Sequence, residues 1–526
     1  MFAGPQGGRG LRSRSTRRFR VREGDWEVPS RYIEDRRTRK ALFLALLAWQ
    51  QTRFAFGVQA HLSQRLFTVY LRQPYTFHLQ RNSAQLIRNV TSETSIFAGN
   101  GILPAMLLLA ESLVLIGLCS LLLFVEPVGA LIVVSVLGVA AWGFHRLTRG
   151  RIARWGRARQ HHEGLRIQHL QQGLGGAKDV KLLGRETDFL EQYRLHNIQT
   201  TRALQLQSTL QQLPRLWLEL LAVAGLVILV ISMLAQDRTL DTLLPTLGLF
   251  AAAAFRIMPS VNRVLSALQS LRYGLPVIDN LHAELKLAIP DAVDMRSPVN
   301  PFHATLELNQ VTYTYPGAAA PALKDISLVI KRGESVGFVG TSGAGKSTLV
   351  DILLGLLAPD TGEVKVDGRN IRGNLRNWQD QIGYVLQSIF LTDDTLRRNV
   401  AFGLAEEQIN SDAVQAAIKA AQLQKFVASL PDGVNTVIGE RGVRLSGGQR
   451  QRIGIARALY HDPAVLVLDE ATSALDTATE QEVMRSVNAL HGRKTILIVA
   501  HRSSTVANCD KLYRLEQGGV AHQGSA

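Results

Sequence analysis

Long apolar runs separated by long polar stretches fill the first 260 residues of the chain. The apolar runs cover residues 41–60, 103–125, 128–144, 213–235 and 243–258. A helix of about 20 apolar residues spans the hydrocarbon core of a bilayer. The first run is the weakest candidate, because two glutamines and an arginine interrupt it. The pattern predicts an all-helical membrane domain with five spans.

The polar stretches between these runs are basic. Residues 61–102 and 145–212 are rich in Arg, a residue that the cytoplasmic loops of membrane proteins collect. We therefore expect 145–212 to be cytoplasmic. Counting back along the chain, the span at 103–125 then starts on the cytoplasmic side of the membrane, and the span at 41–60 starts on the opposite side. Residues 1–40 would then lie outside, although they carry twelve basic and five acidic residues. Their composition is typical of a disordered segment or of a tail on the membrane surface.

The pattern changes after residue 286, where short apolar segments replace the long runs. Strands are expected at 305–314, 326–331, 335–339, 464–468 and 495–499, and a helix at 348–356. Three prolines between 287 and 304 are typical of a linker. We therefore divide the chain into a basic segment (1–40), a transmembrane domain (41–286), a linker (287–304) and a soluble α/β domain (305–526).

Charge and cysteine content narrow the function only slightly. The formal net charge is +16, which nucleic-acid binding or basic cytoplasmic loops would both explain. We favour the loops, because no motif combining aromatic and basic residues is present. Cys119 and Cys509 cannot form a disulfide framework, and no apolar region of a signal peptide follows the basic start.

One glycine-rich segment carries a phosphate-binding motif. Residues 340–347 match G-x-x-x-x-G-K-[ST] between an expected strand and an expected helix, which is the context that this motif needs. Backbone N–H groups of such a loop surround phosphate oxygens, and the following helix N-terminus adds partial positive charge. Lys346 is expected to reach the β- and γ-phosphates and Ser347 to bind Mg²⁺. The candidate binding residues of this segment are Gly340, Thr341, Ser342, Gly343, Ala344, Gly345, Lys346, Ser347 and Thr348.

Further motifs follow at fixed places. Residues 445–449 read LSGGQ, an apolar strand ends in Asp469 and Glu470, residues 473–476 read SALD, and His501 follows another apolar strand. At these residues the chain resembles the ATP-binding-cassette (ABC) family, whose signature sequence is LSGGQ. The resemblance implies an all-α transmembrane domain of the exporter type joined to an α/β P-loop NTPase domain. It also implies ATP and Mg²⁺ as cofactors.

The resemblance assigns a role to each residue. Asp469 suits Mg²⁺ coordination, and Glu470 is placed to act as a general base or to orient the attacking water. Gln387 resembles the Q-loop glutamine, which senses γ-phosphate and Mg²⁺, and His501 resembles the switch histidine. Tyr315 resembles the aromatic residue that stacks on adenine. The predicted catalytic residues are therefore Glu470, His501, Lys346 and Gln387, and the predicted metal ligands are Ser347, Gln387 and Asp469.

The signature implies a second subunit. In the family, two nucleotide domains close head to tail around two ATP molecules, so Ser446 and Gly448 should contact the γ-phosphate at the partner's P-loop. Asp476 resembles the family's D-loop aspartate, which lies at the dimer interface. Glu440 resembles the glutamate of the exporter X-loop, which contacts the coupling helices. The remaining signature residues expected at the site are Gly447 and Gln449. One P-loop and one signature make a homodimer the simplest inference, and a heterodimer with a related half-transporter the alternative.

The transmembrane region departs from the family in one respect. Half-transporters of this kind have six spans, whereas we count five, and the first is the one that this sequence lacks. Residues 1–40 are then a divergent start, a truncation or a reading-frame artefact. Residues 176–186 resemble the region of the second coupling helix, and an ordinary amphipathic cytoplasmic helix would give the same pattern.

The cargo is less well specified. Glu111 and Glu219 lie inside spans, where ionisable residues are functional candidates, with Arg215 and Arg256 as possible partners. Structural ion pairs are the alternative. Residues 255–276 resemble bacterial lipid-linked-oligosaccharide flippases, which implies a bacterial cytoplasmic membrane, and a pyrophosphate headgroup would suit the arginines. Lipid A-like lipids, peptides and hydrophobic drugs are rival cargoes, and a non-functional truncated exporter is a further alternative. The spans exclude a soluble ATPase of DNA repair or translation.

Overall fold

The computed structural model describes residues 27–125, 127–234, 240–288, 300–439, 442–471, 477–500 and 503–524. The chain divides into two compact units. The first comprises Met1–Leu71 and Asn82–Leu287, and the second comprises Arg72–Arg81 and Ala288–Ala526. The assignment of Arg72–Arg81 to the second unit is a feature that the sequence did not predict.

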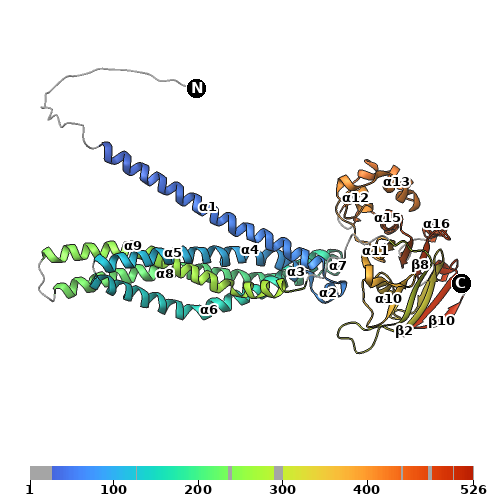
Figure 1. Ribbon diagram of the computed structural model, residues 1–526, viewed down its shortest axis with the longest axis horizontal. Helices are drawn as coiled ribbons and strands as arrows, with labels where there is room; N and C mark the ends of the chain where they lie inside the picture. The colour runs from blue at the N-terminus through green and yellow to red at the C-terminus, as the bar shows by residue number, and fades with distance from the viewer. Residues whose placement is uncertain are drawn as a thin grey trace, which may run out of the picture. The chain divides into compact units, whose positions relative to one another are not determined.

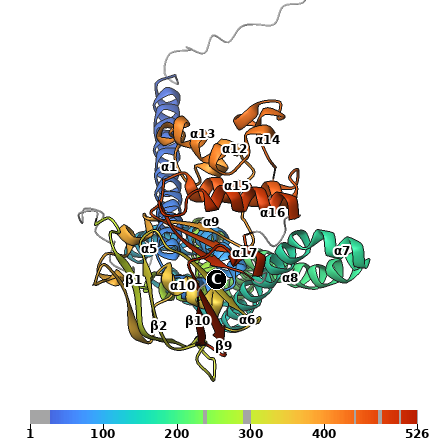
Figure 2. The same cartoon turned by 90° about the vertical axis from the view of Figure 1, so that its right-hand side faces the viewer.

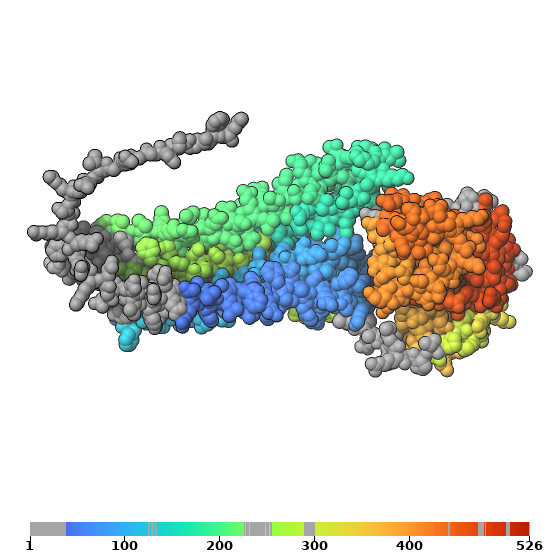
Figure 3. All heavy atoms as spheres, turned by 90° about the horizontal axis from the view of Figure 1, so that it is seen from above, coloured from blue at the N-terminus to red at the C-terminus, as the bar shows by residue number. Residues whose placement is uncertain are grey.

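Five long helices dominate the first unit (Figure 1). They are α1 (Glu27–Leu71), α5 (Leu103–Val125), α6 (Pro127–Gly175), α8 (Glu186–Leu234) and α9 (Leu240–Leu285). Each contains one expected span, and four of them continue into the adjoining polar stretch. Shorter helical pieces complete the unit: α3 (Ser83–Arg88), η1 (Asn89–Glu93), α4 (Thr94–Ile96), η2 (Phe97–Ile102) and α7 (Ala177–Leu183). The space-filling view shows the described parts of these helices running lengthwise (Figure 3).

Among the described residues, one helical stretch meets both the length and the hydropathy expected of a membrane span. This stretch is Ser83–Phe124, with a mean hydropathy of 2.5 over its most apolar window. It contains the run predicted at 103–125. The run at 41–60 is described at every residue and does not meet these criteria, whereas parts of the runs at 128–144, 213–235 and 243–258 lie at residues whose side chains the structure does not describe.

The bundle of the first unit is formed by α5, α6, α8 and α9, which pack on one another. Leu137, Leu218, Ile257 and Leu265 form a small apolar core between them. A Cβ on Gly156 would lie 2.5 Å from the carbonyl oxygen of Tyr273, so this glycine permits α6 and α9 to approach closely. The N-terminal part of α1 diverges from the bundle (Figure 1).

A buried polar network joins the helices outside the expected spans. Glu93 is fully buried, and its carboxylate lies 3.3 Å from Arg159 Nη2 of α6 and 3.5 Å from Arg88 Nε. Asn89 Nδ2 donates to the Tyr70 hydroxyl at 3.1 Å. The network therefore links α1, the α3–η1 segment and α6 through ion pairs and hydrogen bonds.

Two sheets form the framework of the second unit. The first has the order β2-β1-β4-β5 and is antiparallel. Its strands are β1 (Thr305–Tyr313), β2 (Leu323–Lys331), β4 (Thr361–Val366) and β5 (Arg369–Asn370). The second has the order β10-β9-β3-β8-β7-β6, and all its pairs are parallel except β9 with β10. Its strands are β3 (Ser335–Gly340), β6 (Ile382–Val385), β7 (Val465–Asp469), β8 (Thr495–Val499), β9 (Lys511–Glu516) and β10 (Gly519–Gly524).

The six-stranded sheet separates two apolar cores. In β7, Val465 and Val467 face the core that contains the β1–β2 sheet, whereas Leu466 and Leu468 face a second core formed with helices. Alternate residues of β8 divide in the same way. Both strands are therefore buried on both faces, which is why their sequences are continuous apolar runs rather than alternating ones.

The described residues of the second unit also form helices. They are α2 (Tyr75–Gln80), α10 (Lys346–Leu353), α11 (Leu375–Gln379), α12 (Leu396–Val400), α13 (Ser411–Ala420), α14 (Gln424–Ala428), α15 (Gly447–Leu459), α16 (Thr477–Asn488) and α17 (Ser503–Val506). Short 3₁₀ turns accompany them among the described residues: η3 (Ile371–Asn374), η4 (Glu406–Gln408) and η5 (Gly433–Asn435). Figure 2 shows α12 to α16 on one side and β1, β2 and β10 on the other.

The expected elements of this unit agree with the structure apart from their ends. The strand expected at 326–331 begins earlier, at Leu323, because it pairs with Tyr313 of β1. The helix expected at 348–356 begins at Lys346, directly after Gly345, and ends at Leu353. The strand expected at 464–468 is shifted by one residue and includes Asp469.

Candidate active site

The carboxyl ends of four neighbouring parallel strands, β3, β8, β7 and β6, lie side by side in the six-stranded sheet. Phe338 of β3 and Asp469 of β7 both pair with Val499 of β8, and Val385 of β6 pairs with Leu468. The carboxyl ends of parallel strands are where open α/β sheets bind ligands. The register therefore brings together the glycine loop after β3, the acidic pair at the end of β7 and the loop after β6.

The glycine loop is folded tightly against its neighbours. A Cβ on Gly345 would lie 2.8 Å from the Ala322 carbonyl oxygen, and Gly345 has a φ of 101°, which disfavours any other residue. Lys346 is only 6% exposed, and its ammonium donates to the carbonyl oxygens of Gly340 (2.9 Å) and Thr341 (3.0 Å). Thr341 itself is exposed, so the loop presents a cradle of backbone groups to solvent.

Asp469 lies at the carboxyl end of β7 with only 8% of its surface exposed. The Tyr384 hydroxyl donates to its Oδ2 at 3.2 Å. Burial raises the pKa of Asp469, and the hydrogen bond from Tyr384 and the charge of Lys346 oppose that shift. The pKa of Tyr384 is raised by burial and then by the nearby carboxylates, so its hydroxyl is the donor.

Sequence reasoning missed both Tyr384 and a second carboxylate, Asp351. Burial and then the charge of Asp469 raise the pKa of Asp351 to about 6. Asp351 lies on α10, one turn after Ser347, so helical spacing from the P-loop could have found it. Tyr384 lies three residues before Gln387 in the sequence, but only the pairing of β6 with β7 brings its hydroxyl to Asp469.

Glu470 and Gln387 meet at this edge of the sheet. Gln387 Nε2 donates to Glu470 Oε2 at 2.6 Å. Glu470 has a φ of 48°, a left-handed conformation that is uncommon for a non-glycine residue, while its N–H donates to the Val499 carbonyl at 3.0 Å. The chain therefore turns sharply after β7 and directs the Glu470 carboxylate toward the loop after β6.

Tyr315 contacts the same P-loop from another sheet. Its hydroxyl lies 3.2 Å from Thr348 Oγ1, and its ring meets Tyr313 edge to face with centroids 5.1 Å apart. The aromatic residue that sequence reasoning selected is thus next to the phosphate-binding loop.

The LSGGQ motif forms the start of α15. Ser446 is the N-cap residue, and its hydroxyl accepts from Gln449 N at 3.2 Å, while Gln449 Oε1 accepts from Ser446 N at 2.8 Å. This capping box satisfies two helix-end donors. The first-turn residues Gly447 and Gly448 lie between them. Ser446 is exposed, so the motif presents a helix N-terminus that could receive an anion.

The side-chain oxygens of Ser347, Gln387 and Asp469 are of the kind that bind Mg²⁺, the expected metal. Serine hydroxyl, glutamine amide and aspartate carboxylate oxygens are the ligands that Mg²⁺ takes, usually with one or two carboxylates. The described residues contain no group of three or more His, Cys, Asp or Glu side chains that could hold a metal ion. A magnesium site completed by phosphate oxygens does not need such a group. Three predicted residues, Glu440, Asp476 and His501, lie outside the described residues.

The two glutamates expected in the spans each form an ion pair. Arg263 of α9 binds Glu111 of α5 through two contacts, Nε–Oε1 at 2.5 Å and Nη2–Oε2 at 3.1 Å. Arg215 contacts Glu219 at 2.8 Å within α8. Of the two arginines named as possible partners, Arg215 contacts Glu219, whereas Glu111 pairs with Arg263, which the sequence did not suggest. These contacts correspond to the structural alternative that the sequence left open.

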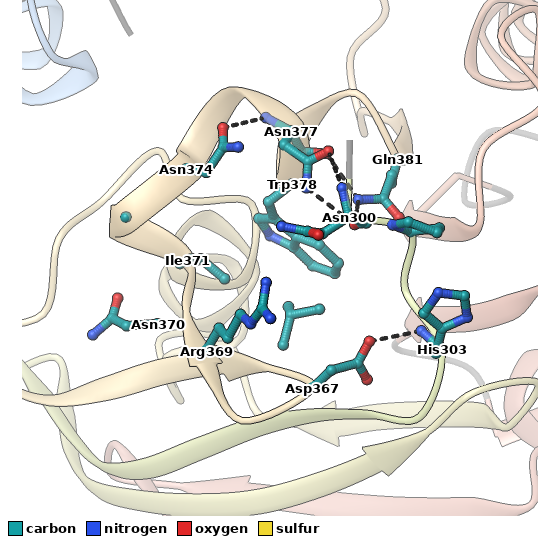
Figure 4. A pocket seen from close by; sticks show the side chains of 13 residues that line it. Asn300, His303, Asp367, Arg369, Asn370, Ile371, Asn374, Asn377, Trp378 and Gln381 are labelled. Atoms are coloured by element: carbon teal, nitrogen blue, oxygen red, sulfur yellow. Dashed lines mark hydrogen bonds between the residues drawn. The ribbon is translucent and has the colours of Figure 1, made fainter. Parts of the chain in front are cut away.

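A pocket of about 400 Å³ lies elsewhere in the second unit (Figure 4). It is bounded by the end of the linker, by the β4–β5 turn and by α11. Asp367 accepts from the backbone N–H groups of His303 (2.7 Å) and Ala304 (2.7 Å), and Gln381 Oε1 accepts from Phe302 N at 2.6 Å. None of the predicted site residues lines this pocket, whose polar groups fasten the linker to the domain.

Comparisons with known proteins cover both units. Residues 323–473 match the family model described as ABC transporter, and residues 41–257 match the ABC transporter transmembrane region. An ATP-dependent lipid A-core flippase from Dechloromonas aromatica (strain RCB) is 33% identical over 485 residues, covering 91% of this chain and 81% of that protein. The flippase of the same name from Thiobacillus denitrificans (strain ATCC 25259 / T1) is 31% identical over 483 residues, covering 91% and 82%.

A solved structure agrees in fold. A bacterial Atm1-family ABC exporter, determined with ATP bound, superposes with a TM-score of 0.78 and 25% identity, covering 93% of this chain and 85% of that chain. The fold class predicted from the sequence is thereby confirmed, as is the coupling of ATP hydrolysis to transport. The chain therefore belongs to the ABC transporter family, as an exporter half-transporter in which a transmembrane domain is fused to an ATP-binding domain.

Proposed function

We propose that this chain is an ATP-driven flippase for a lipid of the lipid A-core kind, and that the residues at the carboxyl ends of β3, β6 and β7 hydrolyse the ATP. The supporting observation is the register that places Lys346, Asp469 and the Gln387–Glu470 pair at adjacent strand ends. In this proposal the P-loop residues 340–348 bind the phosphates, and Tyr315 stacks on adenine. ATP hydrolysis requires positioning and charge stabilisation more than covalent chemistry, which suits these groups.

Each side chain has a separate task in the proposal. Lys346 releases its two carbonyl acceptors and donates to phosphate oxygens instead. Ser347, Gln387 and Asp469 would hold Mg²⁺, which when bound neutralises phosphate charge. Glu470 orients the attacking water or accepts its proton, and its hydrogen bond to Gln387 must open for either role. His501 contacts the γ-phosphate.

We further propose that the working unit is a dimer. One P-loop and one LSGGQ motif are present, and the capped start of α15 offers an anion-binding helix end. A second copy would place its Ser446, Gly447, Gly448 and Gln449 over the nucleotide, with Asp476 at the seam. The partner is a second copy of this chain or a related half-transporter. The nucleotide domain would face the cytoplasm from the bacterial inner membrane.

The cargo proposal rests on the similar proteins. Their name, ATP-dependent lipid A-core flippase, gives lipid A-core as the lipid that those proteins move, and the similarity extends over both domains. A lipid-linked oligosaccharide is the second candidate, on the resemblance of residues 255–276. Arg215 and Arg263 add no support for a pyrophosphate headgroup, because each contacts a glutamate in the structure.

Glu470→Gln tests the hydrolytic role. We expect a loss of at least about 100-fold in the ATPase rate, because general base catalysis contributes 10²–10⁴-fold, with ATP binding retained. Glu407→Gln, at an exposed glutamate of η4, is the matched control and should hydrolyse ATP normally. An unchanged rate in Glu470→Gln would show that another group does the work.

The cargo is tested in proteoliposomes. Fluorescent lipid A-core lipid and a fluorescent lipid-linked oligosaccharide are incorporated separately, and the fraction reaching the other leaflet is measured with ATP and with Glu470→Gln as control. ATP-dependent movement of the first lipid alone is expected. Movement of the lipid-linked oligosaccharide alone would make that lipid the cargo instead. If the chain hydrolyses ATP but moves neither lipid, both cargo proposals are wrong.

A further inference from the structure

Tyr384 occupies a specific place beside the acidic end of β7. It lies on β6, the edge strand of the sheet, and pairs with Val467, two residues before Asp469. This register points the phenol along the strand toward the carboxylate, and the hydroxyl donates to Asp469 Oδ2 at 3.2 Å. The ring packs against the core shared with β1 and β2. Packing therefore restricts the orientation of the Tyr384 ring, and the ring orientation sets the position of its hydroxyl.

The carboxylate that accepts this hydrogen bond is buried beside a second acidic residue. Asp469 is 8% exposed, so water can do little to orient it. Asp351 of α10 lies close enough to interact electrostatically with both Asp469 and Tyr384. Two neighbouring carboxylates repel each other, and an unrestrained Asp469 side chain would rotate away from Asp351. A hydrogen bond to Oδ2 opposes that rotation and presents Oδ1 in one orientation.

We propose that Tyr384 is a positioning residue whose hydroxyl holds the Asp469 carboxylate in the orientation that binds Mg²⁺. This rests on the proposed role of Asp469 as a metal ligand. Tyr384 does not touch the metal, the nucleotide or the attacking water in this proposal. Groups that orient a metal ligand through a hydrogen bond commonly change metal affinity by 10–100-fold when they are removed.

Tyr384→Phe is the variant to test, because it keeps the packed ring and removes the hydroxyl. We expect the Mg²⁺ concentration for half-maximal ATPase activity to rise about tenfold. The ATPase rate at saturating Mg²⁺ should change little, since excess metal restores occupancy. A loss of rate that saturating Mg²⁺ does not restore would overturn the positioning role.

A second readout does not depend on activity. In the Glu470→Gln background, retained radiolabelled ATP is measured against the concentration of free Mg²⁺. Tyr384→Phe should shift this curve to higher Mg²⁺ by a similar factor, while ATP binding measured in EDTA stays unchanged. Normal binding in EDTA also shows that the variant is folded.

Tyr513→Phe is the matched control. Tyr513 lies on β9, three strands from β7 in the sheet, belongs to the same apolar core, and its hydroxyl donates to the Val329 carbonyl at 3.4 Å. Both variants remove one hydroxyl from one core. The control should leave the Mg²⁺ dependence unchanged, and an equal shift in both variants would mean that the effect reports only loss of packing or stability.

Asp469→Asn separates the inference from the proposed function. If Tyr384 acts through Asp469, Tyr384→Phe should produce no further shift in the Asp469→Asn background. If Asp469→Asn alone leaves the Mg²⁺ dependence unchanged, the proposed metal role of Asp469 fails. If Asp469→Asn shifts the curve but Tyr384→Phe does not, the metal role stands and the positioning role fails.

Discussion

At the scale of single residues, the site is arranged around carboxylates with different surroundings. Asp469 is buried and hydrogen-bonded by Tyr384. Glu470 turns out of the strand in a left-handed conformation and accepts from Gln387. Asp351 is half-buried, and its pKa is raised to about 6. The three carboxylates, two at the end of β7 and one on α10, thus have different environments. Carboxylates in different environments can take different roles in catalysis.

Asp351 gives a prediction of pH dependence. Its pKa of about 6 in the folded chain exceeds its ordinary value of 3.8. The folded state therefore holds more protons than the unfolded state between these two values, and this group lowers the free energy of unfolding as the pH rises through that range. Asn cannot ionise, so Asp351→Asn should raise the melting temperature at pH 7.5 more than at pH 5.

The measurement is thermal unfolding of the full chain without nucleotide and in EDTA, at a series of pH values. Asp432→Asn, at an exposed aspartate of the same unit, is the control and should show no pH-dependent difference from the natural chain. A melting-temperature difference for Asp351→Asn that stays constant from pH 5 to pH 7.5 would refute the raised pKa.

At the scale of elements, the first unit depends on an ion pair between helices. Glu93 of η1 and Arg159 of α6 have side chains that are 0% and 3% exposed. Removing one partner of a buried pair leaves an uncompensated charge, which costs about 3–5 kcal/mol, whereas replacing both partners is often neutral. The pair therefore decides whether the segment before α5 packs on α6.

Arg159→Met should accordingly destabilise the chain by about 3 kcal/mol, at the lower end of this range, because Arg88 still contacts Glu93. The triple variant Arg88→Met/Glu93→Gln/Arg159→Met should recover most of this loss, because it removes all three charges of the buried network. Unfolding in denaturant, followed by circular dichroism in detergent, measures both. Arg154→Met, at an exposed arginine of the same helix, serves as control. If the triple variant is as unstable as Arg159→Met, packing rather than charge explains the loss.

At the scale of the whole molecule, one P-loop and one signature per chain require a partner if the proposed composite sites are correct. Lys346→Met and Gly448→Asp should each inactivate a homodimer. A mixed dimer of the two variants contains one site with both halves intact, so about half of the natural ATPase rate is expected from one of two equivalent sites. The mixed dimer is isolated through two different affinity tags.

The control dimer carries both substitutions in one copy and none in the other. Each of its sites then has one damaged half, so it should be inactive. If this control is active while the first mixed dimer is inactive, each site is built within one chain and the composite arrangement is wrong.

The sequence determined the elements whose signals are local. The P-loop was predicted from spacing, because the glycines, Lys346 and Ser347 act within eight consecutive residues. The strand that ends at Asp469 and Glu470 was predicted to within one residue, because burial on both faces requires a continuous apolar run. The membrane and nucleotide domains were distinguished by the lengths of their apolar runs, which the thickness of a bilayer sets.

Only the tertiary structure decided which distant residues meet. Tyr384 and Asp469 are 85 positions apart, and strand register joins them. Arg263 and Glu111 are 152 positions apart, and the packing of α5 on α9 joins them. The apolar runs of β7 and β8 did not reveal that alternate side chains enter two different cores. Periodicity indicates which face of an element is buried. Strand register and helix packing decide what that face contacts, and both depend on residues that are distant in the sequence, so a local segment does not predict them.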